Sequence, residues 1–190
     1  MSKTMKQLHS TVTQDGKLQL TVATVDKPEL TDDEVLIRIE ASPINPSDLG
    51  SFFGPADMST ATATGTSENP MVVAEVPEQL MPTAAARFDK PVPLGIEGAG
   101  IVESAGGSET AHSLVGKTVA LMGGAMYSEY RVAKADQCLV IPNGITPVEA
   151  ASSFVNPLTT LGMAETMRRG ARGTRAHGCR IQPWSDAQHQ

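Results

Sequence analysis

Histidine and cysteine are the side chains most able to bind a metal, and this chain has few of them. A catalytic zinc site needs about three nitrogen, sulfur or carboxylate donors around an open fourth position. The candidate ligands are scattered and show no ligand spacing: His9, His112, His177, His189, Cys138 and Cys179. We therefore predict no metal site. Two cysteines are also too few for a disulfide framework, which favours a reducing compartment.

Two glycine-containing stretches resemble phosphate-binding motifs. The sequence "VGKT" at 115–118 matches the end of a P-loop, but Ala111 stands where that loop needs its first glycine. The sequence "GIEGAG" at 95–100 has the wrong spacing for a dinucleotide fingerprint, and a strand follows it where a helix is needed. We interpret the first stretch as a turn and the glycines of the second as positions of tight packing.

Charge and hydropathy limit the partners. Residues 1–167 carry 10 Lys or Arg against 20 Asp or Glu, a net −10, and residues 168–190 carry five Arg against Asp186, a net +4. Nucleic acid and anionic membranes require clustered positive charge, so we expect neither as a partner. The N-terminus lacks a signal-peptide core, and no run of about 18 apolar residues occurs. We expect a soluble, cytoplasmic protein.

Six short apolar runs predict strands. Apolar and polar residues alternate over 18–25 and again through Val35, Ile37 and Ile39. Four further runs, each bounded by glycine or proline, lie within 97–106, 116–123, 125–133 and 137–142. Such a series is typical of a compact antiparallel barrel or sandwich.

The remaining chain predicts a loop and two helices. Eight of the 13 prolines fall between Pro43 and Pro93, so we expect a long loop at about 54–93 with one strand at 71–76. This loop is either a lid or binding surface or a solvated insertion. Thr146, followed by proline and by Glu149 at capping-box spacing, predicts a helix start. Asn156 is predicted to cap a second helix that reaches about Arg169.

Four stretches in this order resemble the zinc-free, quinone oxidoreductase-like branch of the medium-chain dehydrogenases and reductases. They are "DEVLIRIEASPINPSD", "PLGIEGAGIVESAG", "VGKTVALMGGAMYSEYRV" and "IPNGITPVEAASSFVNPLTTLGM". The resemblance implies a mainly β fold, a GroES-like partial β-barrel, followed by a Rossmann domain that binds NADPH or NADH. It assigns 1–145 to the barrel domain and 146–169 to helices that enter the Rossmann domain.

The resemblance also implies roles for single residues. Zinc-dependent relatives have cysteine and histidine where this chain has Asn45 and Pro46, and histidine where it has Ile96 before Glu97. In zinc-free relatives the asparagine and a later threonine lie by the nicotinamide, which implies cofactor contacts for Asn45 and Thr159. Asn-Pro is also a common turn former, and this alternative stays open. The family's tyrosine shortly after Asp48 is replaced by "LGSFFG".

The stretch 170–190 has neither helical nor strand periodicity. The family requires a parallel strand, a glycine-bearing turn and a helix next, and this stretch has none. A shift of one base near Arg169 or Gly170, by mutation or sequencing error, yields an apolar run, a small-residue turn and a helix start. We therefore expect a truncated chain with an aberrant tail; a genuine, disordered basic terminus is the alternative.

These features lead to two hypotheses of function. The first is a fragment of an NAD(P)H-dependent, zinc-independent oxidoreductase that reduces a quinone, an enone or a similar activated double bond, inactive as a 190-residue chain. The alternative is a non-catalytic GroES-like binding module or an inactive gene-fragment product. An exposed apolar face around 150–163 predicts aggregation or a homodimer. We identify no catalytic acid.

Overall fold

The computed structural model describes residues 3–170 of the chain. One compact unit ends at Asn156, and a second begins at Pro157. The predictions for residues 170–190 stay predictions, because all of these residues except Gly170 lie outside the described part.

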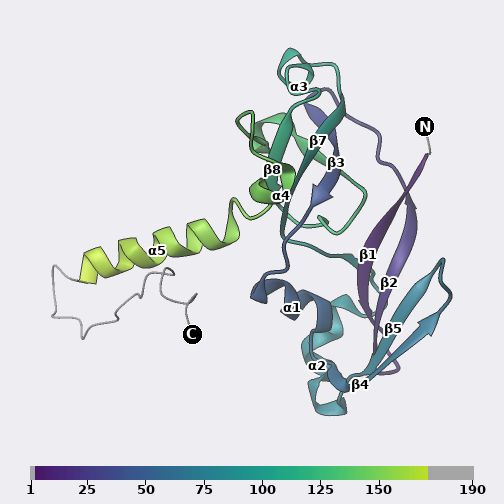
Figure 1. The fold of residues 1–190 in the computed structure, drawn as a ribbon. Coiled ribbons are helices and arrows are strands. Elements are labelled where there is room, and N and C mark those ends of the chain that lie inside the picture. Colours follow the sequence, from purple (N-terminus) through teal and green to yellow (C-terminus); the bar gives the residue numbers. More distant parts are fainter. Residues whose placement is uncertain (1–2, 171–190) are drawn as a thin grey trace, which may run out of the picture. The chain divides into compact units, whose positions relative to one another are not determined.

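The first sheet is built on the N-terminal hairpin. Its strands lie in the order β4-β5-β2-β1-β6, where β4 is Asp57–Gly65, β5 is Pro70–Glu75 and β6 is Val92–Pro93, and all neighbouring strands are antiparallel. β1 (Thr4–Val12) and β2 (Lys17–Asp26) form its centre, and Val12 and Leu18 point into a small core. Figure 1 shows the β4–β5 hairpin continuing this sheet beside β2.

The second sheet holds the main core. Its order is β10-β8-β7-β3-β9, again antiparallel throughout. The strands are β3 (Glu34–Ala41), β7 (Glu97–Ala105), β8 (Thr118–Met122), β9 (Tyr130–Lys134) and β10 (Leu139–Val140). Apolar side chains of four strands fill the interior, among them Ile37, Val102 and Leu121. The two antiparallel sheets confirm the predicted mainly β fold class.

The glycines of "GIEGAG" have the predicted packing role. A β-carbon added to Gly100 would lie 2.0 Å from the carbonyl oxygen of Arg38 on β3. No side chain fits in that space, so glycine lets β7 approach β3 closely. Gly116 of "VGKT" has φ +78° and lies in the turn before β8, as predicted.

The prediction of a long loop at about 54–93 is wrong for much of that stretch. The predicted strand at 71–76 is confirmed as β5 (Pro70–Glu75), but the stretch also contains β4 (Asp57–Gly65) and β6 (Val92–Pro93), which were not predicted. Short helical segments η1 (Glu78–Leu80), α2 (Met81–Ala84) and η2 (Ala85–Arg87) lie between β5 and β6. β4 has small, mostly exposed residues without apolar alternation, so pairing with β5 stabilises it more than burial does. Composition alone therefore gave no strand signal there.

The remaining helical elements are α1 (Pro46–Phe53), α3 (Glu109–His112), η3 (Ala135–Gln137), α4 (Pro147–Ala150) and α5 (Val155–Gly170). The predicted start of α4 is confirmed, since Thr146 and Glu149 form a reciprocal capping box. The prediction that Asn156 caps the next helix is wrong, because α5 already begins at Val155. Among residues 3–170, no helix is long and apolar enough to cross a membrane.

Candidate functional site

Asn45 is held at the start of α1 by a neighbouring carboxylate. Its backbone N–H donates to Oδ2 of Asp48 over 2.8 Å, and the N–H of Ile96 donates to Oδ1 of the same residue over 3.1 Å. Asn45 and Asp48 are both buried, at 2% and 1% exposure. One buried aspartate therefore joins the first turn of α1 to the segment that enters β7.

Glu97 is the most deeply buried charged side chain of this region, with 0% exposure. Its Oε1 accepts a hydrogen bond from Nδ2 of Asn45 over 3.0 Å. Its Oε2 accepts from the backbone N–H groups of Phe154 and Val155, over 2.8 and 3.0 Å. Burial of a carboxylate is costly unless hydrogen bonds satisfy it, and three N–H donors do so here.

The contacts of Glu97 also explain where α5 begins. The first N–H groups of a helix have no partner within the helix, and a negative charge near them is favourable. Glu97 supplies that acceptor from β7, so the start of α5 does not depend on the side chain of Asn156. The amide of Asn156 instead donates to Oδ1 of Asn45 over 3.4 Å.

The structure thus joins the buried side chains of Asn45 and Glu97 to the exposed side chain of Asn156 in one polar network. These contacts use one of the two amide hydrogens of Asn45 and one lone pair of its oxygen. The sequence alone did not mark Glu97 as a site residue. The available signal was a carboxylate within a run of glycine and alanine at the start of a buried strand.

Tyr127 adds an aromatic hydroxyl to this part of the molecule. The hydroxyl donates to the carbonyl oxygen of Pro43 over 2.8 Å, and the ring lies 5.2 Å from that of Phe52 on α1. Burial, and then the negative charges of Asp48 and Glu97, raise the pKa of Tyr127 well above its ordinary value. The phenol therefore stays protonated near neutral pH. It lies against "LGSFFG", the stretch in which the family's own tyrosine is missing.

Thr159, the second predicted cofactor residue, is an exposed residue of α5 and belongs to the second unit. The cofactor roles of Asn45 and Thr159 stay predictions.

The described residues also show how the candidate metal ligands are placed. Residues 3–170 contain no group of three His, Cys, Asp or Glu side chains that could hold a metal ion. Ile96, where zinc-dependent relatives have histidine, offers no side-chain donor. Burial, followed by the charge of Asp136, raises the pKa of the Cys138 thiol to about 11. A protonated thiol is a poor metal ligand and a poor nucleophile.

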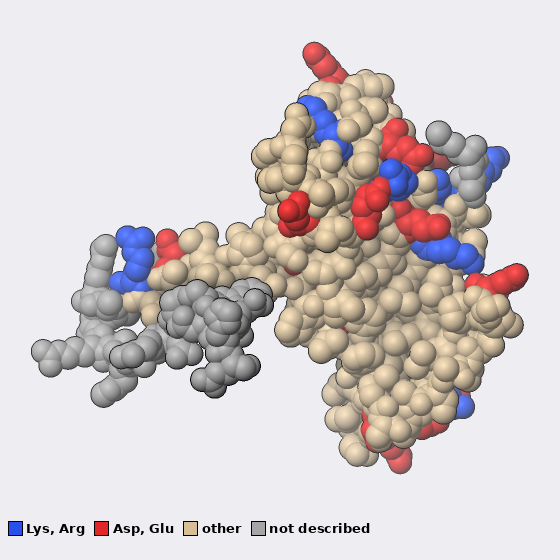
Figure 2. Space-filling model, viewed as in Figure 1, with Lys and Arg blue, Asp and Glu red and all other residues tan. Residues whose placement is uncertain are grey.

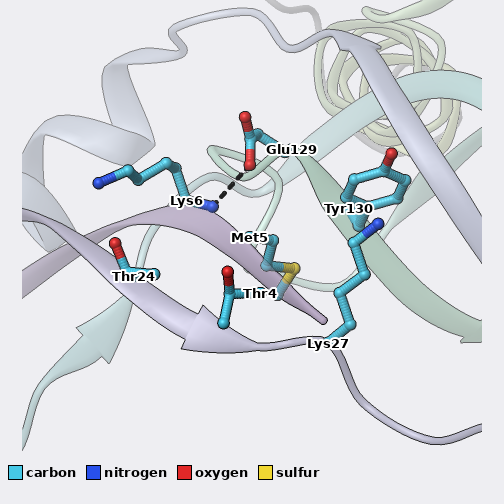
Figure 3. Close-up of a pocket in the computed structure, with 7 residues that line it drawn as sticks. All are labelled: Thr4, Met5, Lys6, Thr24, Lys27, Glu129 and Tyr130. Carbon is cyan, nitrogen blue, oxygen red and sulfur yellow. Dashed lines mark hydrogen bonds between the residues drawn. The ribbon is translucent and has the colours of Figure 1, made fainter. Parts of the chain in front are cut away.

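Figure 3 shows a different pocket, of about 430 Å³, at the junction of the two sheets. It is lined by Thr4, Met5, Lys6, Thr24, Lys27, Glu129 and Tyr130. Glu129 accepts from the backbone N–H of Lys6 over 2.7 Å, and the Lys27 ammonium lies 3.4 Å from the centre of the Tyr130 ring. These contacts join β1 and the residue after β2 to the start of β9 and the residue before it. We assign this pocket a structural role.

The surface charge is mixed. On the face in Figure 2, Lys and Arg lie interspersed with Asp and Glu, and no broad basic area is visible among the described residues.

Comparisons with known proteins agree with this architecture. The alcohol dehydrogenase GroES-like domain matches residues 31–143. A search of curated proteins finds no match. Three solved structures share the fold. A Mesorhizobium loti protein described as an NADPH:quinone reductase is 23% identical, covers 90% of this chain and has a TM-score of 0.58.

A Bacillus thuringiensis protein, also described as an NADPH:quinone reductase, is 27% identical over 87% of this chain, with a TM-score of 0.57. A mycobacterial protein solved with NADPH is 21% identical over 85%, with a TM-score of 0.53. This chain spans only 46%, 42% and 40% of the three structures, respectively. The chain therefore belongs to the alcohol dehydrogenase GroES-like domain family of the medium-chain dehydrogenases and reductases.

Proposed function

We propose that this chain supplies the substrate-side half of an NAD(P)H-dependent, zinc-independent oxidoreductase that reduces a quinone, an enone or a similar activated double bond. The observation that carries the proposal is the buried Asn45 amide, bonded to Glu97 and Asn156 within an alcohol dehydrogenase GroES-like domain. The quinone reductases with the same fold support the substrate class.

NAD(P)H, when bound, supplies the hydride and is oxidised to NAD(P)⁺, while the conjugated substrate gains that hydride and a proton. In this proposal Asn45 contacts the carboxamide of the nicotinamide, and the cofactor contact of Thr159 stays a separate prediction. Asn45 fits the role, because its hydrogen bonds to Glu97 and Asn156 leave an amide with further donor and acceptor capacity. Its buried surroundings also strengthen any hydrogen bond made there.

The described residues fit only the nicotinamide end of the cofactor. A dinucleotide site needs parallel strands and a glycine-rich turn before a helix, and both sheets within residues 3–170 are antiparallel. We therefore propose that the 190-residue chain alone has no hydride-transfer activity. Measurable NADPH oxidation by this purified chain with a quinone contradicts that statement.

A chimera tests the function. Residues 1–156 form one compact unit and can replace the corresponding segment of the Bacillus thuringiensis quinone reductase, which is 27% identical. We expect the chimera to oxidise NADPH with 1,4-benzoquinone, and Asn45→Ala to lower kcat/KM by roughly 10- to 100-fold, since a misplaced cofactor slows transfer strongly. Circular dichroism and NADPH titration control for folding and cofactor binding. A folded chimera that binds NADPH but gives only the background rate refutes the proposal.

The second candidate is a binding module without catalysis, and the separate core of residues 1–156 favours it. It predicts a cooperative thermal transition and a monodisperse solution state. We also propose a homodimer through exposed apolar residues, such as Val148 at 73% exposure or Met163 at 62%. Light scattering coupled to size exclusion separates the monomer, the dimer and the aggregate.

A further inference from the structure

The two carboxylate oxygens of Glu97 accept hydrogen bonds from different parts of the chain. Oε2 takes the backbone N–H groups of Phe154 and Val155, and Oε1 takes the side-chain amide of Asn45. All three partners are N–H donors, so both oxygens act only as acceptors. The side chain is fully buried, so water does not replace a missing partner.

This arrangement determines how the amide of Asn45 is turned. The oxygen and the NH₂ group of an amide have nearly the same shape, so packing alone does not distinguish the two orientations. An acceptor at Glu97 requires the NH₂ group of Asn45 on that side. The oxygen of Asn45 then faces Asn156, whose NH₂ group donates to it.

We propose that Glu97 is a positioning residue that fixes the donor and acceptor ends of the Asn45 amide, an inference that rests on the proposed function. The carboxamide of a nicotinamide is itself one donor group and one acceptor group. With the Asn45 amide in one orientation, each of its groups faces a complementary group of the nicotinamide carboxamide. With the Asn45 amide reversed, NH₂ faces NH₂ and oxygen faces oxygen. Glu97 thus makes Asn45 specific for one placement of the nicotinamide ring, although it does not touch the cofactor.

The variant Glu97→Gln distinguishes a positioning role of residue 97 from a role limited to packing. The oxygen of the new glutamine takes the two backbone N–H groups, so its own NH₂ group faces Asn45. The amide of Asn45 must then reverse, with its oxygen toward residue 97 and its NH₂ group toward Asn156. A role limited to packing predicts no reversal, because the two side chains have the same size.

The measurement uses the full 190-residue chain labelled with ¹⁵N-asparagine, which holds four asparagines: Asn45, Asn69, Asn143 and Asn156. In the wild-type chain we expect exchange of the Asn45 amide hydrogens to be about tenfold slower than that of Asn69, with NOEs to the Glu97 side chain. In Glu97→Gln we expect those NOEs to move to Asn156. Glu103→Gln, on the same strand, is the control and leaves the Asn45 signals unchanged.

A variant with two substitutions keeps the inference testable if Glu97→Gln destabilises the chain. In Glu97→Gln with Asn45→Asp, the glutamine NH₂ group donates to the aspartate, the glutamine oxygen keeps the backbone N–H groups, and Asn156 still donates to residue 45. We expect this pair to recover most of the melting temperature lost in the single variant. In the chimera we expect its kcat/KM to stay as low as that of Asn45→Ala, because an aspartate side chain offers no N–H group to the nicotinamide.

Three results overturn the inference. They are fast hydrogen exchange of the wild-type Asn45 amide, unchanged Asn45 NOEs in Glu97→Gln, and full activity of the chimera that carries both substitutions. The first two need no turnover. An inactive wild-type chimera therefore counts against the proposed function alone, whereas unchanged NOEs count against the role of Glu97 alone.

Discussion

Buried polar residues join segments of this fold that lie far apart in the sequence. Glu97 and Asp48 are almost inaccessible carboxylates, and each is satisfied by N–H donors. The sequence could not predict these bonds, because Glu97 lies 52 residues from Asn45 and 57 from Phe154 along the chain. Local spacing does not reveal a network that only the fold assembles. Asn45 itself was predicted as a site residue from family resemblance.

His9 provides a pH-dependent test at the residue scale. This β1 residue is 9% exposed, and burial lowers its pKa below the ordinary value of 6.5. His9 therefore binds a proton more readily in the unfolded chain than in the folded chain. The contribution of His9 to stability is present above pH 6.5 and is lost as the pH falls toward the lowered pKa of the folded state.

We expect the free energy of unfolding to decrease between pH 7.5 and 5.5 by at most ~1.4 kcal/mol per pH unit from this residue. His9→Gln should flatten that slope in urea titrations, and His112→Gln, at an exposed position, is measured as the matched control. Equal slopes in the wild-type chain and His9→Gln contradict the assignment.

At the scale of elements, those with strong local signals were predictable. Alternating apolar residues predicted β2 and β3, and the Thr146–Glu149 spacing predicted the start of α4. β4 was missed because its small exposed residues show no periodicity. The start of α5 was misplaced because a distant carboxylate, rather than Asn156, accepts from its first N–H groups.

Thr146→Ala tests the local signal directly. The hydroxyl oxygen of Thr146 accepts from the N–H of Glu149, and the Glu149 carboxylate accepts from the N–H and hydroxyl of Thr146. Loss of such a cap costs ~1 kcal/mol, so we expect a lower urea midpoint at an unchanged m-value. Thr146→Ser retains the hydroxyl and should match the wild-type chain. An identical midpoint for Thr146→Ala shows that the cap does not stabilise the fold.

For the whole molecule, the antiparallel architecture and the family match agree, while the activity is proposed from less than half the length of the related structures. The fold class was predictable because strand signals recur along residues 18–142. The family match, residues 31–143, covers most of that range. The cofactor contacts were not, since residues 3–170 contain no parallel-stranded nucleotide-binding unit.

Isotope transfer in the chimera tests the central claim most directly. The chimera is incubated with NADPH that carries deuterium in the transferable position at C4 and with an α,β-unsaturated ketone, and the product is analysed by mass spectrometry and NMR. If residues 1–156 hold an activated double bond against the nicotinamide, deuterium appears at the β-carbon of the saturated ketone, and Asn45→Ala slows its appearance. A folded, NADPH-binding chimera that leaves the ketone unreduced, and shows no transfer to a quinone either, contradicts the account.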